Sequence, residues 1–373
     1  MRRAALVTHG PLTVVGGAER HLGYLLGFLK DEGFSVDVVT PQDVQAPRII
    51  QRYFYPLVQY FYTGRELSRH LQDYDLIVTI SFTGGSLKGT NVINISYGSV
   101  WSYYRSIRQD VDYNWKWHIG MYLTIWLDRL NKRGKFCVTI SEQVRRELDG
   151  DYGVKSISVP LGVDMEHFSN RILAKDARRS IGIDEQGTVG LFSGRWDVAH
   201  KGLDVLVPIM RERRDIHWLL CTDRDLAVDG VRNLTVLRKV AYAEMPKVYC
   251  AADFSIQLSR YESFGLAFLE SVACRVPVIS TPVGVTNEIY ADPPLSELVV
   301  ANPTVCREKT VREVNSVIEA LKSREYSDRL AALGRAAVER EFSLDMWKVR
   351  MRDVLQRVVE ERYASNDDFF MGR

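Results

Sequence analysis

Two carboxylates, Glu262 and Glu270, stand eight positions apart in the stretch YESFGLAFLE, with Ser-Phe-Gly directly after the first acid. The stretch follows the apolar run DFSIQL, so it is predicted to form the turn after a buried strand and a helix that begins at about Phe264 or Gly265. Backbone amides at the start of a helix attract anions such as phosphate. Two acids beside such amides suit a ligand that carries both phosphate and hydroxyl groups, as a nucleotide sugar does.

The amides expected to face the phosphate belong to Ser263, Phe264, Gly265 and Leu266. The residue types also allow a purely structural interpretation. In that case Glu262 is a charge that stabilises the helix N-terminus, and Glu270 is a solvated residue on the helix surface.

Basic residues and glycines are expected at similar positions elsewhere. The segment GRWDVAHKG follows the predicted strand 188–194 and carries Arg195 and Lys201, whose guanidinium and ammonium groups suit a diphosphate. The segment VVGGAER places Gly16 and Gly17 before the first helix, where a residue without a side chain lets a ligand approach the backbone. Each signal is weak alone, since surface charges and glycine turns are common.

Together these residues resemble the retaining glycosyltransferases of family GT4, which have the GT-B fold. The resemblance covers most of the chain and includes PLGVDMEHF at 160–168 and PVISTPVGVTNEI at 277–289. It implies that Arg195 and Lys201 hold the diphosphate, that Glu262 binds the hydroxyls of the donor sugar, and that Glu270 binds the ribose. It also implies transfer without a metal ion or a cofactor, from a UDP-, GDP- or other nucleotide sugar to an acceptor bound mainly by the N-terminal domain.

One departure from the family pattern concerns the N-terminal domain. Many members have a histidine after the fourth strand, whereas VINISYGSVW here offers Tyr97 or Ser96. We take Tyr97 as the catalytic candidate at this position. His9 and His118 are weaker candidates, because a single histidine is more often structural.

Apolar runs alternate with helical patterns along the chain, which is typical of a parallel, doubly wound α/β sheet. The predicted strands of the first half are residues 4–9, 34–39, 75–80, 91–95, 135–140 and 156–160. Those of the second half are residues 188–194, 216–221, 234–237, 253–258, 276–280 and 297–300. We therefore expect a Rossmann-like acceptor-binding domain at 1–165 and a Rossmann-like nucleotide-sugar domain at 166–345, facing each other across a cleft. Residues 346–373 are expected to form a C-terminal helix that packs towards the N-terminal domain, followed by a tail.

Composition excludes several classes of protein. The chain has 373 residues, 46% of them apolar, and a net charge of only +2, so wholesale nucleic-acid binding is not expected. The five cysteines are scattered without a CxxC pair, which predicts reduced thiols. No signal peptide or long apolar run is present. We expect a cytoplasmic protein, either soluble or peripheral on the inner face of the plasma membrane.

A competing metal signal is the DRD segment that begins at Asp223, since Asp-x-Asp binds divalent ions in other glycosyltransferases. The same pattern occurs at 73–75 and at 110–112, and so short a pattern arises by chance. All three are interpreted as surface acids, so no metal site is predicted.

Two segments, 49–70 and 114–136, interleave aromatic and basic residues. Such helices suit the surface of an anionic membrane, and we expect docking through the basic residues Arg129, Lys132, Arg133 and Lys135. The alternative is an ordinary packed helix with a solvated basic face.

The predicted function is transfer of a hexose-type sugar, with retention, to a glycan or lipid-linked acceptor in the synthesis of an envelope polysaccharide or a glycolipid. A nucleotide-sugar epimerase with the same fold remains an alternative, because it shares the diphosphate site. A non-catalytic nucleotide-sugar binding protein is a second alternative.

Overall fold

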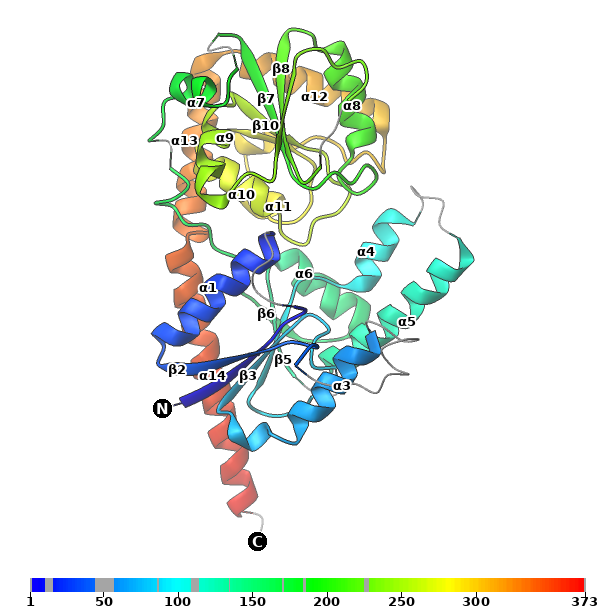
Figure 1. The fold of residues 1–373 in the computed structure, drawn as a ribbon, viewed down its shortest axis with the longest axis vertical. Coiled ribbons are helices and arrows are strands. Elements are labelled where there is room, and N and C mark those ends of the chain that lie inside the picture. Colours follow the sequence, from blue (N-terminus) through cyan, green and yellow to red (C-terminus); the bar gives the residue numbers. More distant parts are fainter. Residues whose placement is uncertain are drawn as a thin grey trace. The chain divides into compact units, whose positions relative to one another are not determined.

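The computed structural model describes residues 2–10, 16–43, 57–85, 87–108, 114–133, 135–169, 171–183, 186–224 and 228–371, with only the backbone described for 57–61, 71 and 359–371. The chain forms two compact units (Figure 1). Unit 1 contains the residues up to Arg105, residues 114–161 and the chain from Trp347 onward. Unit 2 contains residues 106–108 and Gly162–Met346. The sequence placed the boundaries after residues 165 and 345.

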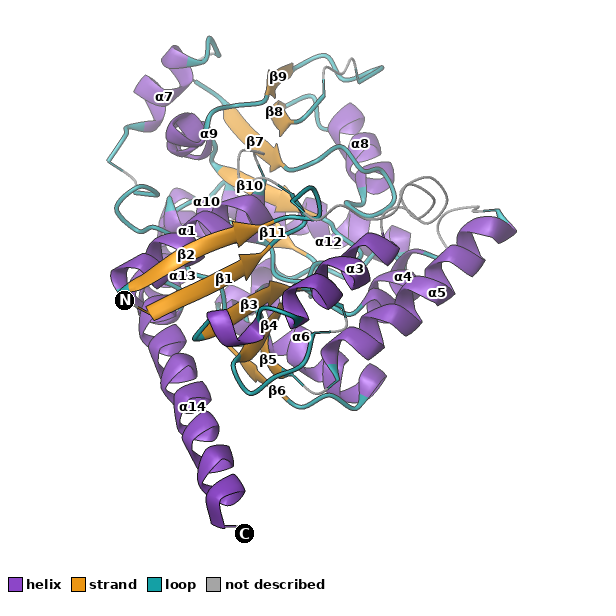
Figure 2. Ribbon diagram, turned by 60° about the horizontal axis from the view of Figure 1, so that its bottom comes forward, coloured by secondary structure: helices purple, strands orange, loops and turns teal. Residues whose placement is uncertain are grey.

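Unit 1 is built on a parallel sheet of six strands in the order β2-β1-β3-β4-β5-β6, seen side by side in Figure 2. The strands are β1 (Arg2–Val7), β2 (Phe34–Val39), β3 (Leu76–Ile80), β4 (Val92–Ser96), β5 (Phe136–Thr139) and β6 (Ser156–Ser158). Every residue of β3 and β4 is buried. Continuous burial is typical of central parallel strands, because crossover helices cover both faces of the sheet.

The described helices of unit 1 connect these strands. They are α1 (Gly17–Asp31), α3 (Leu57–Ser68), the short 3₁₀ helix η1 (Leu71–Asp73), α4 (Val100–Ile107), α5 (Trp115–Lys132), α6 (Glu142–Glu147) and a π-helical turn, η2 (Leu148–Tyr152). None of the described helices of either unit is long and apolar enough to cross a membrane.

Unit 2 is built on a parallel sheet of five strands in the order β11-β10-β7-β8-β9. The strands are β7 (Thr188–Ser193), β8 (Ile216–Thr222), β9 (Leu234–Arg238), β10 (Phe254–Gln257) and β11 (Val278–Ser280). The helices are α7 (Ala174–Ser180), α8 (Leu203–Glu212), η3 (Tyr242–Glu244), α9 (Met245–Cys250), α10 (Leu266–Ala273), α11 (Thr286–Ile289), η4 (Leu295–Leu298), α12 (Arg307–Leu321) and α13 (Arg324–Glu341). The last helix, α14 (Leu344–Met371), continues into unit 1.

The predicted α/β organisation is confirmed, with one wrong strand. Residues 297–300 were predicted as a strand, but Leu295–Leu298 form a 3₁₀ helix and only an isolated bridge joins Val299 to Ser280. The apolar residues there are buried without pairing along a ladder, since Leu298 and Val300 are 0% and 2% exposed. Burial alone does not distinguish a strand from a packed turn.

The strand order fixes where a ligand is expected in each unit. In unit 2 the order reverses between β7 and β10, and in unit 1 it reverses between β1 and β3. Ligands of open α/β sheets bind outside the carboxyl ends of the strands at such a reversal, because the loops there diverge. The loops after β7 and β10 are those that carry Lys201 and Glu262.

The C-terminal helix is part of the core of unit 1. Trp347, at the start of α14, is 1% exposed and packs edge-on against Phe28 of α1 at 5.5 Å between ring centroids. Arg352 of α14 donates to the carboxylate of Glu32 at 2.6 Å. In Figure 1 the red helix therefore returns beside the blue segment that begins the chain.

Candidate active site

A lysine–carboxylate pair occupies the reversal point of unit 2. Lys201 Nζ donates a hydrogen bond to Glu262 Oε1, and Ser259 Oγ donates to the same oxygen at 2.8 Å. The pair stays partly open, because the side chains of Lys201 and Glu262 are 16% and 15% exposed. A ligand arriving from solvent can therefore reach both charges.

The surroundings of Glu262 keep it ionised. Burial of the carboxylate opposes ionisation, but the positive charge of Lys201 and the hydrogen bonds from Lys201 and Ser259 outweigh it, so the pKa of Glu262 lies below its usual value. At neutral pH Glu262 is thus a charged hydrogen-bond acceptor with a fixed orientation.

Arg260 ties the two loops of the site together. Its backbone N–H donates to His200 O at 2.9 Å, and its Nη1 donates to Ala199 O at 2.5 Å. The guanidinium fork also donates to both carboxylate oxygens of Asp204, at 2.9 Å each. Arg260 was not predicted from the sequence, where its only signal is its position two residues before Glu262. Arg260 holds the loop of Lys201 against the loop of Glu262.

A glycine lets these loops approach each other closely. Gly202 has φ of +65°, and a Cβ added there would lie 2.1 Å from the carbonyl oxygen of Leu258 at the end of β10. A side chain at this position would push the segment of Lys201 away from β10, because the obstacle is backbone.

The start of α10 is a second feature of the site. Gly265 precedes the helix with φ of +103° and, having no side chain, offers no cap to the amides of the first turn. Phe264 anchors the turn, since it is 4% exposed and its carbonyl oxygen accepts from Val285 N at 2.7 Å. A Cβ on Gly284 would lie 2.2 Å from that same oxygen. Ser263 and Leu266 flank the turn and are half-buried, so the predicted anion-binding amides stand on a braced turn.

Glu270 is not a solvated helix residue, so that alternative is wrong. It is 3% exposed, and its Oε2 accepts from the Tyr249 hydroxyl at 2.8 Å. The Tyr249 hydroxyl also lies 3.4 Å from Ser193 Oγ, at the end of β7. Glu270 is therefore a buried acceptor at the strand ends, and its ribose-binding role stays a prediction.

Arg195 is exposed on the loop after β7. The neighbouring backbone N of Trp196 donates to Asp223 Oδ1 at 3.1 Å, which lowers the pKa of Asp223. The first acid of the DRD segment thus supports the loop of Arg195, while the third lies outside the described residues. Among the residues that the structure describes, no group of three or more His, Cys, Asp or Glu could hold a metal ion.

In unit 1, Gly16 and Gly17 stand at the start of α1, where they were predicted. Tyr97 follows β4, and its hydroxyl lies 2.6 Å from Nδ1 of His21, which is a residue of α1. Burial raises the pKa of Tyr97 and lowers the pKa of His21 to about 3, so both side chains are neutral at pH 7. His21 was not predicted as a site residue from the sequence. The hydroxyl of Tyr97 is thus held by a buried neutral partner, and its catalytic role remains a prediction.

The two histidine candidates from the sequence, His9 and His118, have local partners. His9 is exposed and its ring lies 4.9 Å from that of Phe82. His118 Nδ1 lies 3.0 Å from the hydroxyl of Tyr104, between α5 and α4. The contact of His118 is that of a packing residue.

Of the four basic residues predicted to dock on lipid, Lys132 is buried, so the prediction is wrong for it, and Lys135 is half-buried and hydrogen-bonded within unit 1. Lys132 is 0% exposed and pairs with Asp128, one turn earlier on α5. Lys135 donates to Gly84 O at 3.2 Å, and burial lowers its pKa to about 7. The helical period turns Lys132 inward together with Asp128, whereas Arg129 and Arg133 are exposed.

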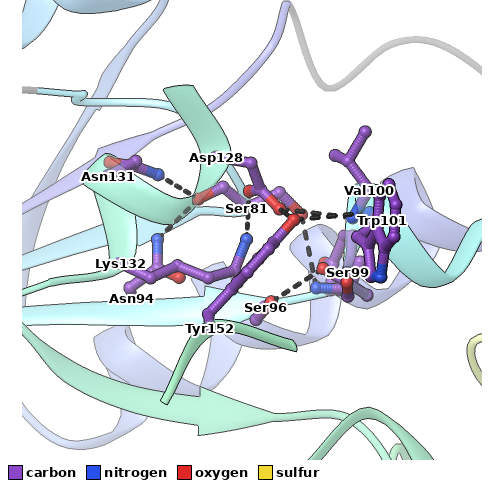
Figure 3. A network of polar contacts seen from close by, with 12 residues as sticks. Ser81, Asn94, Ser96, Ser99, Val100, Trp101, Asp128, Asn131, Lys132 and Tyr152 are labelled. Atoms are coloured by element: carbon purple, nitrogen blue, oxygen red, sulfur yellow. Dashed lines mark hydrogen bonds and ion pairs between the residues drawn. The ribbon is translucent and has the colours of Figure 1, made fainter. Parts of the chain in front are cut away.

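The Asp128–Lys132 pair belongs to a buried polar network (Figure 3). Asp128 Oδ2 accepts from the Tyr152 hydroxyl at 2.8 Å and from Val100 N at 3.3 Å. Asn131 Nδ2 donates to Ser81 O at 2.5 Å. These bonds join the end of α5 to η2 and to the loops after β3 and β4, so they fix the segment that follows Tyr97.

The fold first defines the class of protein. Sucrose-phosphate synthase from Thermosynechococcus elongatus superposes with a TM-score of 0.78 at 17% identity, covering 97% of this chain and 100% of that chain. At such low identity the likeness shows the fold alone, which is the GT-B fold.

Sequence comparisons then define the family. Residues 15–167 match the family model "Glycosyltransferase Family 4", and residues 187–319 match "Glycosyl transferases group 1". The two matches together span most of the chain. This chain belongs to family GT4 of the GT-B glycosyltransferases.

Two curated relatives are similar over part of their length. The phosphatidyl-myo-inositol mannosyltransferase of Mycobacterium tuberculosis is 26% identical over 219 residues, which are 54% of this chain and 54% of that protein. A D-inositol 3-phosphate glycosyltransferase of Segniliparus rotundus is 31% identical over 197 residues, 48% of this chain and 41% of that protein. The matched region spans about half the length of these relatives.

Proposed function

We propose that this protein transfers a hexose-type sugar from a nucleotide diphosphate to a lipid-linked or other glycan acceptor, with retention and without a metal ion. The Lys201–Glu262 pair beside the start of α10 carries the proposal. It sets a cation, an ionised acceptor and helix N-terminal amides at the reversal point of one sheet. Those three groups match the diphosphate and the sugar hydroxyls of one ligand.

The chemistry follows from the charge that develops. Breaking the bond between the sugar and the diphosphate creates a cationic, oxocarbenium-like sugar and a leaving group that gains negative charge. Lys201, Arg195 and the amides of residues 263–266 stabilise that charge, because fixed donors interact more strongly with the transition state than with the ground state. No step needs a metal ion to neutralise the diphosphate.

The two carboxylates take separate parts in donor binding. We assign Glu262 to the sugar hydroxyls, because it is ionised and held by Ser259. We assign Glu270 to the ribose, which it binds together with the Tyr249 hydroxyl that already orients it. When the donor binds, Lys201 turns from Glu262 to the phosphate and frees one acceptor position on the acid.

We further propose that a hydroxyl of the acceptor attacks the same face of the sugar that the diphosphate leaves. The leaving phosphate guides the hydroxyl and takes its proton as the bond between the sugar and the diphosphate breaks. Glu262 is engaged as a hydrogen-bond acceptor and is not assigned as a nucleophile. This route gives retention through the leaving group itself.

The relatives suggest the class of acceptor. One is named for mannosyl transfer to phosphatidyl-myo-inositol and the other for glycosylation of inositol 3-phosphate. We propose that this chain acts on a membrane lipid with a polyol or sugar head group, and that it binds as a peripheral protein to the inner, anionic face of the plasma membrane.

The first experiment is a thermal-shift screen of UDP- and GDP-sugars, followed by transfer assays with the best donor and a total lipid extract. A ligand that binds the native state raises the melting temperature by mass action. We expect one donor class to stabilise the protein and its labelled sugar to appear in lipid, with activity unchanged by EDTA. A strict need for Mn²⁺ or Mg²⁺ would reopen a role for Asp223.

The same assay separates the alternatives. An epimerase would convert the donor into its epimer without a glycosylated product. A non-catalytic binding protein would show the thermal shift with neither product. Either result, obtained with a donor that binds, would overturn the proposed transfer.

A further inference from the structure

Five large apolar side chains are exposed on one face of α5, a helix seen beside α4 in Figures 1 and 2. They are Trp115 (67% exposed), Ile119 (58%), Tyr122 (53%), Leu123 (50%) and Trp126 (57%). Their spacing follows the helical period, so they form a continuous stripe, called here the outer face of α5.

The outer face is larger than the scattered apolar residues found on most surfaces. Eleven helical steps correspond to a length of about 17 Å. With roughly 100 Å² exposed from each side chain, the stripe measures on the order of 500 Å², which is the size of the largest apolar patch on a typical monomer, and such patches are often functional.

The exposed charges described on α5 and directly after it have one sign. Lys116, Arg129 and Arg133 are exposed along or beyond the stripe. The single acid of α5, Asp128, is 1% exposed and already paired with Lys132. The exposed surface of this helix is therefore apolar and positively charged, with no acid of its own to balance it.

The helix is held in place mainly from its inner side, and Tyr122 of the outer face adds a contact with the ring of Tyr104 of α4, with centroids 5.5 Å apart. Trp117 and His118, on its inner side, pack against the ring of Tyr104 of α4, with centroids 5.7 and 5.9 Å apart. Asn114 caps the first turn by accepting from Trp117 N at 3.0 Å. The last turn is fixed through Asp128 and Lys132. The stripe thus lies on a helix that is already formed, so docking loses little conformational entropy of the chain.

We propose that the outer face of α5 inserts into the interface of an anionic lipid bilayer. The apolar side chains would lie at the boundary between head groups and acyl chains, where tryptophan and tyrosine are favoured. Lys116, Arg129 and Arg133 would lie at the lipid phosphates. This inference rests on the proposed function, because it gives a membrane-bound acceptor its docking surface. It keeps the docking of the aromatic and basic segment 114–136 expected from the sequence, and assigns it to the outer face of α5 without the buried Lys132.

A second copy of the chain fits the outer face less well. A standard interface buries about 800 Å² per partner, which is more than the stripe provides. Two copies would also bring their arginines together, and α5 has no exposed acid to pair them. We therefore assign the surface to lipid and make self-association an outcome of the test.

The test compares matched pairs of substitutions in the full chain, using vesicles of phosphatidylcholine with and without phosphatidylglycerol. Ile119→Ser with Leu123→Ser should weaken binding to the anionic vesicles by roughly thirtyfold, since each side chain loses partial burial in lipid. The control is Leu173→Ser with Val305→Ser, two aliphatic residues of unit 2 that are 59% and 82% exposed. The control pair should change binding by less than about twofold.

Charge and insertion are tested separately. Arg129→Ser with Arg133→Ser should also weaken binding to anionic vesicles by roughly thirtyfold, and raised salt should reduce that difference. Brominated lipids should quench part of the tryptophan emission of the bound protein. Trp115→Phe with Trp126→Phe should remove that quenching while the protein stays bound, because phenylalanine keeps most of the apolar contact.

The outcomes distinguish this inference from the proposed transfer. None of these measurements uses a nucleotide sugar, so vesicle binding stands even if no transfer is found. Equal binding by the Ile119/Leu123 variant and its control would overturn the inference, as would tryptophan emission that is not quenched in the bound protein. A dimer in sedimentation velocity that the Ile119/Leu123 variant dissociates, without vesicle binding, would assign the face to a second copy.

Discussion

Two lysine–carboxylate pairs lie in the two units, and their surroundings differ. Lys132 and Asp128 are 0% and 1% exposed and belong to one helix of unit 1. Lys201 and Glu262 are 16% and 15% exposed and come from two loops of unit 2. The first pair is sealed by Tyr152 and the loops of its sheet, whereas the second faces the solvent at the strand ends.

The difference separates structural charge from functional charge. A sealed pair cannot exchange partners, because removal of either member leaves a buried charge without compensation. A partly open pair can exchange, because solvent or a ligand can take the place of either member at a modest cost. We therefore assign the sealed pair to folding and the open pair to ligand binding.

The largest expected effect is the loss of protein stability when the sealed pair is broken. Lys132→Ala should lower the free energy of unfolding by about 3–5 kcal/mol, because Asp128 would stay buried without its counter-charge. Lys201→Ala should lower it by less, since the open pair is 16% and 15% exposed and Ser259 still donates to Glu262. Urea titrations of the two variants, followed by circular dichroism, measure the difference.

A double variant tests the cause of that loss. Asp128→Asn with Lys132→Met removes both charges and keeps an acceptor for the Tyr152 hydroxyl, so most of the stability should return. Equal losses for Lys132→Ala and Lys201→Ala would erase the distinction between the two pairs.

The second prediction concerns turnover at the open pair. Lys201→Ala and Glu262→Gln should each lower kcat by about 10² to 10³, with donor binding weakened mainly by the lysine change. The matched control is Lys247→Ala, which breaks an exposed pair with Glu244 on the same unit. Steady-state kinetics with the donor found by thermal shift give the comparison. Wild-type turnover in either site variant would remove Lys201 and Glu262 from the reaction.

The third prediction concerns the guanidinium fork that joins the two loops. Arg260→Lys keeps the charge but loses the bidentate contact with Asp204, so the loops should shift and kcat/KM should fall by about tenfold. Arg213→Lys is the control, because Arg213 also makes a bidentate contact, donating from Nε and Nη2 to Asp215 at 2.9 Å each, beside the start of β8. A purely structural role for Arg260 would lower the melting temperature of both variants alike and leave kcat/KM unchanged.

The sequence predicted the open pair better than the sealed one, for a physical reason. Lys201 and Glu262 follow apolar runs that form β7 and β10, and the ends of parallel strands meet at one edge of a sheet. The spacing of Lys201 and Glu262 from these strands in the sequence therefore predicts where the two residues lie in the fold. The partnership of Arg260 with Asp204 joins residues 56 positions apart, and no local pattern specifies it.

The sealed pair had a signal that was not used. Asp128 and Lys132 are four residues apart, the spacing at which opposite charges meet on a helix. The sequence reads as basic and aromatic throughout that segment, and only the packing against η2 and the β3 and β4 loops decides which side is buried. The strand predicted at 297–300 failed in the same way, because tertiary burial of Leu298 and Val300 resembles the pattern of a strand.

The smallest expected effect is on the pH dependence of stability, and it comes from a third pair of side chains, His21 and Tyr97, which are both neutral. Burial lowers the pKa of His21 to about 3 in the folded chain, against about 6.5 when unfolded. Between these values the unfolded chain binds a proton that the folded chain does not, so stability falls as the pH drops below about 6.5. From about pH 7 to about pH 6 the free energy of unfolding should fall by about 0.7 kcal/mol, and at lower pH the loss should approach 1.4 kcal/mol per pH unit.

His21→Phe should remove this part of the pH dependence of stability in urea titrations, whereas His70→Phe, at an exposed position, should keep it. The open pair contributes in a different window, because Glu262 has a lowered pKa and loses its contribution only below the ordinary range of a glutamate. An unchanged slope between about pH 7 and about pH 6 in His21→Phe would mean that the histidine is charged in the folded chain, and the neutral partner assigned to Tyr97 would be wrong.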